Sequence, residues 1–188
     1  MTQTEGTTQA AHNKTVKTGI IASLALALLS TAALFYLIGP FAHAGPFAHA
    51  APFEDRLTLA IQCAILPGFM LLAGIITLGK GRFGNEAEDP TACEASSQAM
   101  KVNIRYLSNT HEQFSLFIIN ILALALLLPA PALTLLPIYA GLFVVGRIAF
   151  WIGYHLNPLH RATGFGLTFY PSVAAMLYNV FAVLAGLV

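Results

Sequence analysis

The sequence predicts an all-α integral membrane protein with five membrane-spanning helices. Of its 188 residues, 57% are hydrophobic and only 9% are charged, whereas a soluble domain usually carries about 25% charged residues. The apolar residues gather into runs of about 20, which is the length at which a helix crosses a bilayer. The nine Lys and Arg residues are scattered along the chain, so nucleic acid is not an expected partner.

The apolar runs divide the chain into a tail, one separate span and a domain with four spans. The tail is rich in Thr and Gln, and we expect it to be disordered. Four later runs cover about 57–78, 107–128, 133–154 and 165–187. The predicted organisation is a disordered tail (1–17), an extra N-terminal span (18–38), a loop (39–54) and a four-span domain (55–188).

The N-terminal span has two interpretations. Lys14 and Lys17 precede it and Ala-x-Ala sequences follow it, which is also the pattern of a cleaved signal peptide. Its apolar stretch exceeds the 7–15 residues of a signal core, so we favour an uncleaved anchor. The loop after it repeats the motif PFAHA and contains His43 and His49. We interpret this repeat as a local duplication and predict no metal site.

The basic residues alternate between successive loops. Because positively charged loops stay in the cytoplasm, the alternation predicts a cytoplasmic N-terminus and an external C-terminus. In a bacterial cell the protein would lie in the inner membrane. Arg56 is the one basic residue on the opposite side. The residues that define the cytoplasmic side are Lys14, Lys17, Lys80, Arg82, Lys101 and Arg161.

Three polar residues stand at the head of the third apolar run. Arg105, Asn109 and Glu112 are spaced i, i+4 and i+7, so they share one stripe of a helix. Glu112 is the only acidic residue within an apolar run. An ionisable residue inside a bilayer is costly unless it is paired or faces a watery cavity, so it indicates a functional site.

The same side of the predicted bundle carries more arginines than one glutamate can pair. Arg147 and Arg161 flank Tyr154 in the sequence. In a purely structural interpretation, Glu112 pairs with Arg147 or Arg105, and Tyr154 anchors the interface. At least two arginines would then lack an acidic partner. Since guanidinium binds carboxylates in a bidentate manner, the surplus predicts an anionic ligand.

Two motifs resemble those of the MAPEG family, the membrane-associated proteins in eicosanoid and glutathione metabolism. The resemblance covers about residues 55–188 and follows the order of the helices. One departure is Phe150, which stands where several family members have a tyrosine. The motifs are Arg105-x3-Asn109-x2-Glu112, then Arg147-x5-Gly153-Tyr154 with Arg161 seven residues later.

The resemblance implies a four-helix bundle that assembles as a homotrimer and binds glutathione between neighbouring subunits. It implies that Arg161 stabilises the glutathione thiolate. A free thiol has a pKa of about 8.5, and a guanidinium in a partly dry site would favour the thiolate. The residues implied to hold glutathione as a co-substrate are Arg105, Asn109, Glu112, Arg147 and Tyr154.

These features lead to one expected function and two alternatives. The expectation is a glutathione-dependent membrane transferase or peroxidase, whose thiolate attacks a lipophilic electrophile or hydroperoxide arriving from the bilayer. The first alternative is a non-catalytic protein of the same fold with a structural or partner-binding role. A carrier that uses Glu112 ranks last, because no acidic or polar path crosses the outer halves of the predicted spans.

Overall fold

The computed structural model describes residues 52–84, 97–157 and 159–186, together with scattered positions between 14 and 36. The predicted tail, N-terminal span and repeat loop therefore lie largely outside the described residues, and they stay predictions. The elements of the described domain are α2 (Phe53–Arg82), α3 (Gln98–Leu127), the short 3-10 helix η2 (Ala130–Thr134), α4 (Leu135–Leu156) and α5 (Arg161–Leu184).

Four helices in the described part of the chain are long and apolar enough to cross a membrane. They confirm the four predicted spans of the domain. The helices extend beyond the apolar runs, most clearly at the start of α3, which begins at Gln98 rather than near residue 107. Ser97 caps this extension because its side chain accepts a hydrogen bond from the backbone N–H of Met100.

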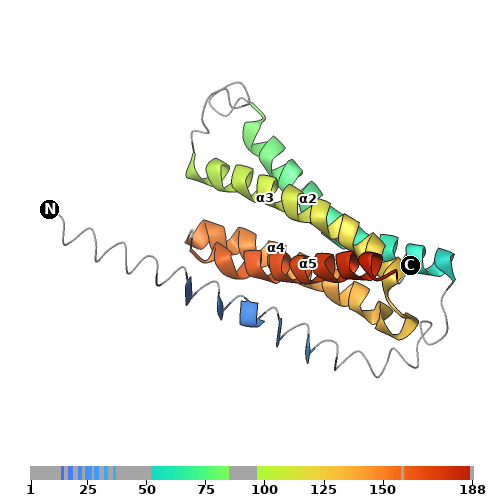
Figure 1. The fold of residues 1–188 in the computed structure, drawn as a ribbon. Coiled ribbons are helices and arrows are strands. Elements are labelled where there is room, and N and C mark those ends of the chain that lie inside the picture. Colours follow the sequence, from blue (N-terminus) through green and yellow to red (C-terminus); the bar gives the residue numbers. More distant parts are fainter. Residues whose placement is uncertain are drawn as a thin grey trace.

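The helices are arranged as two pairs, α2 with α3 and α4 with α5 (Figure 1). The pairs lie together where α3 ends and α4 begins, and they diverge toward the other end. Their common core is built mainly by α3 and α4, with Phe117, Leu136 and Phe143 almost completely buried. A separate buried cluster of Val102, Tyr106, Phe150 and Tyr154 packs the helices at the diverging end.

A glycine allows α4 and α5 to approach closely. A Cβ atom added at Gly164 of α5 would lie 2.1 Å from the backbone nitrogen of Phe150 and 2.5 Å from the carbonyl oxygen of Gly146. No side chain fits in that space. Small residues at helix crossings are typical of membrane proteins, where close backbone packing holds helices together.

A polar cluster lies in the middle of the bundle. The amide nitrogen of Asn120 donates to the carbonyl oxygen of Ser172 at 2.9 Å, and Asn179 donates to the side-chain oxygen of Asn120 at 3.1 Å. The hydroxyls of Tyr139 and Ser172 are 2.9 Å apart and hydrogen-bonded. Hydrogen bonds of this kind link α3, α4 and α5 where water is absent.

Arg56, the exception to the charge alternation, is bonded to the end of another helix. Its guanidinium donates to the carbonyl oxygens of Ala125 at 3.0 Å and Leu128 at 2.7 Å. These carbonyls belong to the last turn of α3 and its C-cap residue, where backbone acceptors lack helical partners and the helix dipole favours a cation. The structure thus gives the charge of Arg56 a local function.

Candidate functional site

The hydroxyl of Tyr154 accepts hydrogen bonds from two arginines at the diverging end of the bundle. Arg105 donates at 2.9 Å and Arg161 at 2.8 Å. The three residues come from α3, α4 and α5, so the bonds join both helix pairs. Tyr154 is only 3% exposed, whereas both arginines are exposed. The guanidiniums therefore meet on a buried oxygen but stay accessible from outside.

The turn between α4 and α5 sets the position of Arg161. Arg161 is the first residue of α5, and its guanidinium also lies 4.8 Å from the centre of the Tyr154 ring. The turn passes close to α4 at Gly153, where a Cβ atom would lie 2.9 Å from the carbonyl oxygen of His160. This close approach brings Arg161 back over the tyrosine seven residues earlier.

A second arginine group lies deeper in the bundle. Arg147 is completely buried, and it donates to the side-chain oxygen of Asn109 at 2.7 Å. It also bonds the hydroxyl of Thr168 and, at 3.4 Å, the carbonyl oxygen of Gly164. All three acceptors are neutral. Two of its three nitrogens are thus bonded to neutral groups, Nε has no partner, and no described carboxylate pairs with it.

Phe150 lies beneath this buried guanidinium. The centre of its ring is 4.8 Å from the guanidinium carbon of Arg147, within the range of a cation–π interaction. Phe143 flanks the same group at 5.8 Å. The phenylalanine that departs from the family motif therefore contributes to the environment of Arg147.

Glu112 stands apart from both arginine groups. It is exposed, and no salt bridge joins it to a described arginine, so the pairing with Arg147 or Arg105 that the purely structural interpretation requires is not formed within one chain. The stripe of Arg105, Asn109 and Glu112 is confirmed as one side of a continuous helix. Arg105 and Asn109 bind residues of α4, whereas Glu112 lies on the outer surface.

Two partners of the site were not identified from the sequence. Thr168 and Gly164 bind Arg147, and they are spaced i, i+4 on α5. That spacing places a small residue and a hydroxyl on one side of the helix, which is the signal that could have indicated them. Their pairing with Arg147, however, depends on how α5 packs against α4.

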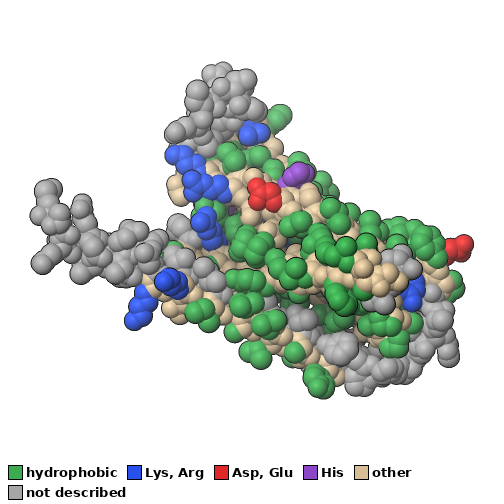
Figure 2. Space-filling view, viewed as in Figure 1, with side chains coloured by type: hydrophobic (Ala, Val, Ile, Leu, Met, Phe, Trp, Pro, Cys, Tyr) green, Lys and Arg blue, Asp and Glu red, His purple; other side chains and the backbone are tan. Residues whose placement is uncertain are grey.

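Basic side chains gather at the diverging end of the bundle (Figure 2). We call this region the basic end. Of the acidic residues that the structure describes, two lie in the first turn of α2 at the opposite end, and the third is Glu112. Within the described chain the basic end is therefore rich in positive charge. Its residues are Lys80, Arg82, Lys101, Arg105 and Arg161.

Comparison with known proteins supports the family suggested by the motifs. The model of the MAPEG family matches residues 57–181. Transmembrane protein 79 of Bos taurus is 28% identical over 128 residues, which are 68% of this chain and 32% of that protein. Transmembrane protein 79 of Mus musculus is 26% identical over the same length and shares. The chain thus spans about a third of these curated relatives.

No solved structure matches the chain significantly. The family match begins in the first turns of α2 and ends near the end of α5. It therefore covers all four described helices and every residue of the two arginine groups. The chain belongs to the MAPEG family.

Proposed function

We propose that the protein is a glutathione-dependent membrane transferase or peroxidase that binds glutathione at the basic end. One observation carries this proposal. Two exposed guanidiniums, from Arg105 and Arg161, converge on the hydroxyl of Tyr154, and neither forms a salt bridge with a described carboxylate. Guanidinium groups that face solvent without a carboxylate suit an anionic ligand such as the glutathione peptide.

The two arginines would have different roles. Arg105 would bind a carboxylate of glutathione, and Arg161 would stabilise the thiolate from its position over Tyr154. The thiolate is the nucleophilic form of the thiol, and a fixed positive charge in a partly dry site favours it strongly. A lipophilic acceptor that arrives from the bilayer would then be attacked by the sulfur atom.

Asn109 and Arg147 would act together at the inner edge of the site. Asn109 is half-buried and Arg147 is fully buried, and the bond between them fixes the orientation of the asparagine amide. Asn109 would contact the peptide, and Arg147 would position Asn109. A direct contact between Arg147 and glutathione remains a prediction that would require the buried guanidinium to move.

The exposure of Glu112 supports assembly as a homotrimer. The residue lies on α3 just before an exposed apolar surface that includes Leu116 and Ile119. A carboxylate facing lipid would be very unfavourable, so we propose that a neighbouring subunit covers it. Glu112 would then meet the ammonium group of glutathione between two subunits.

The test is calorimetric binding of glutathione to the full chain in detergent, with the ultraviolet difference signal of the thiolate near neutral pH. We expect binding with thiolate formation, and loss of the thiolate signal in Arg161→Ala. Arg82→Ala is the matched control, because Arg82 lies at the same end but outside the site. No binding at millimolar glutathione, or an unchanged thiolate signal in Arg161→Ala, would contradict the proposal.

The second candidate function is a non-catalytic membrane protein with a structural or partner-binding role. One observation favours it: Arg147 and Asn109 of the family motifs bind each other inside the chain, as residues with a purely structural role would do. This candidate predicts that glutathione neither binds nor forms a thiolate, while the protein still assembles as a trimer. The same calorimetric experiment therefore separates the two functions.

A further inference from the structure

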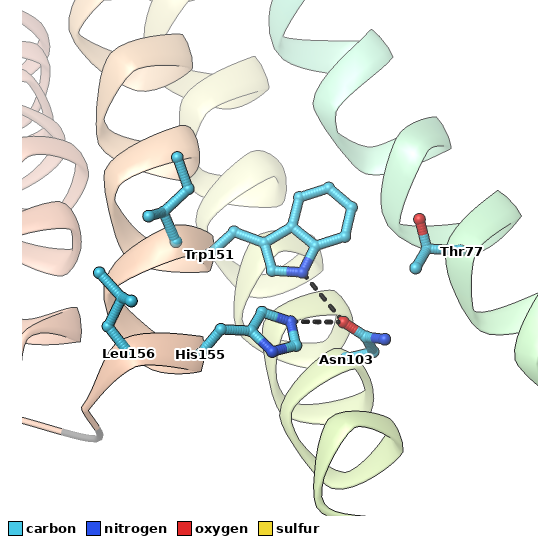
Figure 3. Close-up of a pocket in the computed structure, with 6 residues that line it drawn as sticks. Thr77, Asn103, Trp151, His155 and Leu156 are labelled. Carbon is cyan, nitrogen blue, oxygen red and sulfur yellow. Dashed lines mark hydrogen bonds between the residues drawn. The ribbon is translucent and has the colours of Figure 1, made fainter.

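An open cavity of about 390 Å³ lies near the basic end, and no residue of the two arginine groups lines it. It is formed by α2, α3 and α4 (Figure 3). Trp151, Ile152 and Leu156 give it apolar walls, and Thr77, Asn103 and His155 contribute polar groups. None of these six residues belongs to the site proposed for glutathione, so the cavity needs a separate explanation.

Asn103 is the polar centre of the cavity. Its side-chain oxygen accepts a hydrogen bond from the indole N–H of Trp151 at 3.0 Å and lies 3.2 Å from Nε2 of His155, with which it is also bonded. Its amide nitrogen points away from both residues, toward the side of Thr77 (Figure 3). No described residue accepts a hydrogen bond from that nitrogen, so a donor is available within the cavity.

The cavity is held in shape by aromatic stacking. The indole of Trp151 is nearly parallel to the ring of Tyr106, with their centres 4.2 Å apart. Tyr106 is fully buried and donates to the carbonyl oxygen of Met70 on α2 at 3.2 Å. The donor of Asn103 is thus presented by a fixed group of side chains rather than by a free surface residue.

Positive charge borders the cavity. Lys80 is exposed and follows Thr77 by three residues on α2, a spacing that places both on the same side of the helix. His155 adds an imidazole that is hydrogen-bonded to Asn103. The described acidic residue nearest in sequence to Asn103 is Glu112, more than two turns further along α3. The charge therefore suits an anion.

The apolar wall of the cavity lies on the outer surface of the bundle. Ile152 is 57% exposed and Leu156 is 74% exposed, on a helix that is apolar enough to cross a membrane. The cavity volume lies at the lower end of the range for small-molecule sites, so it holds a headgroup and the start of a chain. Basic pockets between membrane helices are suited to lipid headgroups.

We infer that this cavity binds one anionic phospholipid of the surrounding bilayer. The phosphate accepts a hydrogen bond from the amide of Asn103 and lies near the ammonium of Lys80. The acyl chain follows Ile152 and Leu156 into the membrane. This site is independent of the proposed glutathione function, because neither Arg105, Tyr154 nor Arg161 contributes to it.

Trp151 provides the readout, since it is the only tryptophan of the chain. The full chain is placed in phospholipid nanodiscs in which a fraction of the lipid carries brominated acyl chains, which quench indole fluorescence on contact. We expect brominated phosphatidylglycerol to quench Trp151 with an apparent affinity about fivefold higher than that of brominated phosphatidylcholine, as one nearby basic residue would give. Equal quenching by the two lipids, or none by either, would overturn the inference.

Matched variants separate a site from a general surface charge. Lys80→Gln is expected to lose the preference for phosphatidylglycerol. Asn103→Asp keeps the acceptor for Trp151 and His155 but replaces the free donor with a negative charge, so it is also expected to lose the preference. Lys101→Gln removes an exposed charge two residues from Asn103, on the opposite face of α3. The inference fails if Lys101→Gln lowers the preference as much as Lys80→Gln.

Discussion

The two arginine groups of this protein have the same chemistry but opposite exposure. Arg147 is fully buried and binds Asn109, Thr168 and Gly164. Arg105 and Arg161 are exposed and share the hydroxyl of Tyr154. All of these acceptors are neutral. The comparison teaches that burial, rather than membership of a family motif, decides which arginine is free to meet a ligand.

The physical reason is the cost of removing a guanidinium from water. That cost is several kcal/mol for a buried ion, so the hydrogen bonds of Arg147 must be kept whatever else binds. An exposed guanidinium keeps its solvent and can exchange one acceptor for another at little cost. The inner group is therefore suited to fix structure, and the outer group is suited to bind and release ligand.

The largest effect is expected for Gly164→Ala, which would disturb both groups at once. The new methyl would lie 2.1 Å from the nitrogen of Phe150, so α5 must move away from α4 with Thr168 and Arg161. We expect a loss of about 3 kcal/mol in the free energy of unfolding, measured in mixed SDS micelles.

The control for this variant is Gly79→Ala on α2. Nothing lies within 4 Å of a Cβ atom at this position, and alanine is the better helix former. The control is expected to gain up to about 1 kcal/mol. If Gly164→Ala has the same free energy of unfolding as the wild type, α4 and α5 do not approach as closely as described.

The second prediction sets the two groups directly against each other. Arg147→Met would leave the buried oxygens of Asn109 and Thr168 without their donor, and we expect it to lower the free energy of unfolding by about 2 kcal/mol. Arg105→Met, which changes an exposed side chain, is expected to cost less than about 0.5 kcal/mol. Equal losses in the same unfolding assay would remove the distinction between an inner and an outer group.

A smaller effect is expected for Asn120→Leu, in the polar cluster at the middle of the bundle. The substitution removes the bonds to Ser172 and to the side chain of Asn179. Interhelical hydrogen bonds in membranes are individually weak, so we expect a loss of about 1.5 kcal/mol. A loss as large as that of Arg147→Met would show that the cluster, and not the arginine, dominates the interior.

A change in stability smaller than that of Asn120→Leu is expected for Tyr154→Phe. The variant keeps the ring beneath Arg161 but removes the oxygen shared with Arg105, and we expect a loss below about 1 kcal/mol. Its effect should fall on the ligand instead, as reduced thiolate formation with bound glutathione. An unaltered thiolate signal would mean that Tyr154 does not organise the arginines for binding.

The four-helix domain could be predicted from the sequence because the apolar composition of each span is enough to identify it. The apolar runs located α2 to α5, and the two motifs indicated the family that the comparison confirms. The ends of the helices were less predictable. The early start of α3 depends on the cap at Ser97, which lies outside the apolar run.

The site could be predicted in part. The sequence placed Tyr154 between Arg147 and Arg161, but in the structure its partners are Arg105 and Arg161. Seven residues along a helix correspond to about 10.5 Å, so Arg147 lies too deep to share the hydroxyl. The residues that bind Arg147 depend on the packing of α4 against α5. That packing cannot be inferred from local sequence.

The bonds of Arg56 also determine when the helices can come together during synthesis. Arg56 is separated by 69 residues from Ala125 and by 72 from Leu128, whose carbonyl oxygens accept its hydrogen bonds, so these two bonds form only after the end of α3 has been made. The contact of Arg56 with the end of α3 therefore requires the whole of α3. Once that point is reached, α2 and α3 can close as a hairpin before α4 and α5 are made, and the second pair then adds to a preformed first pair.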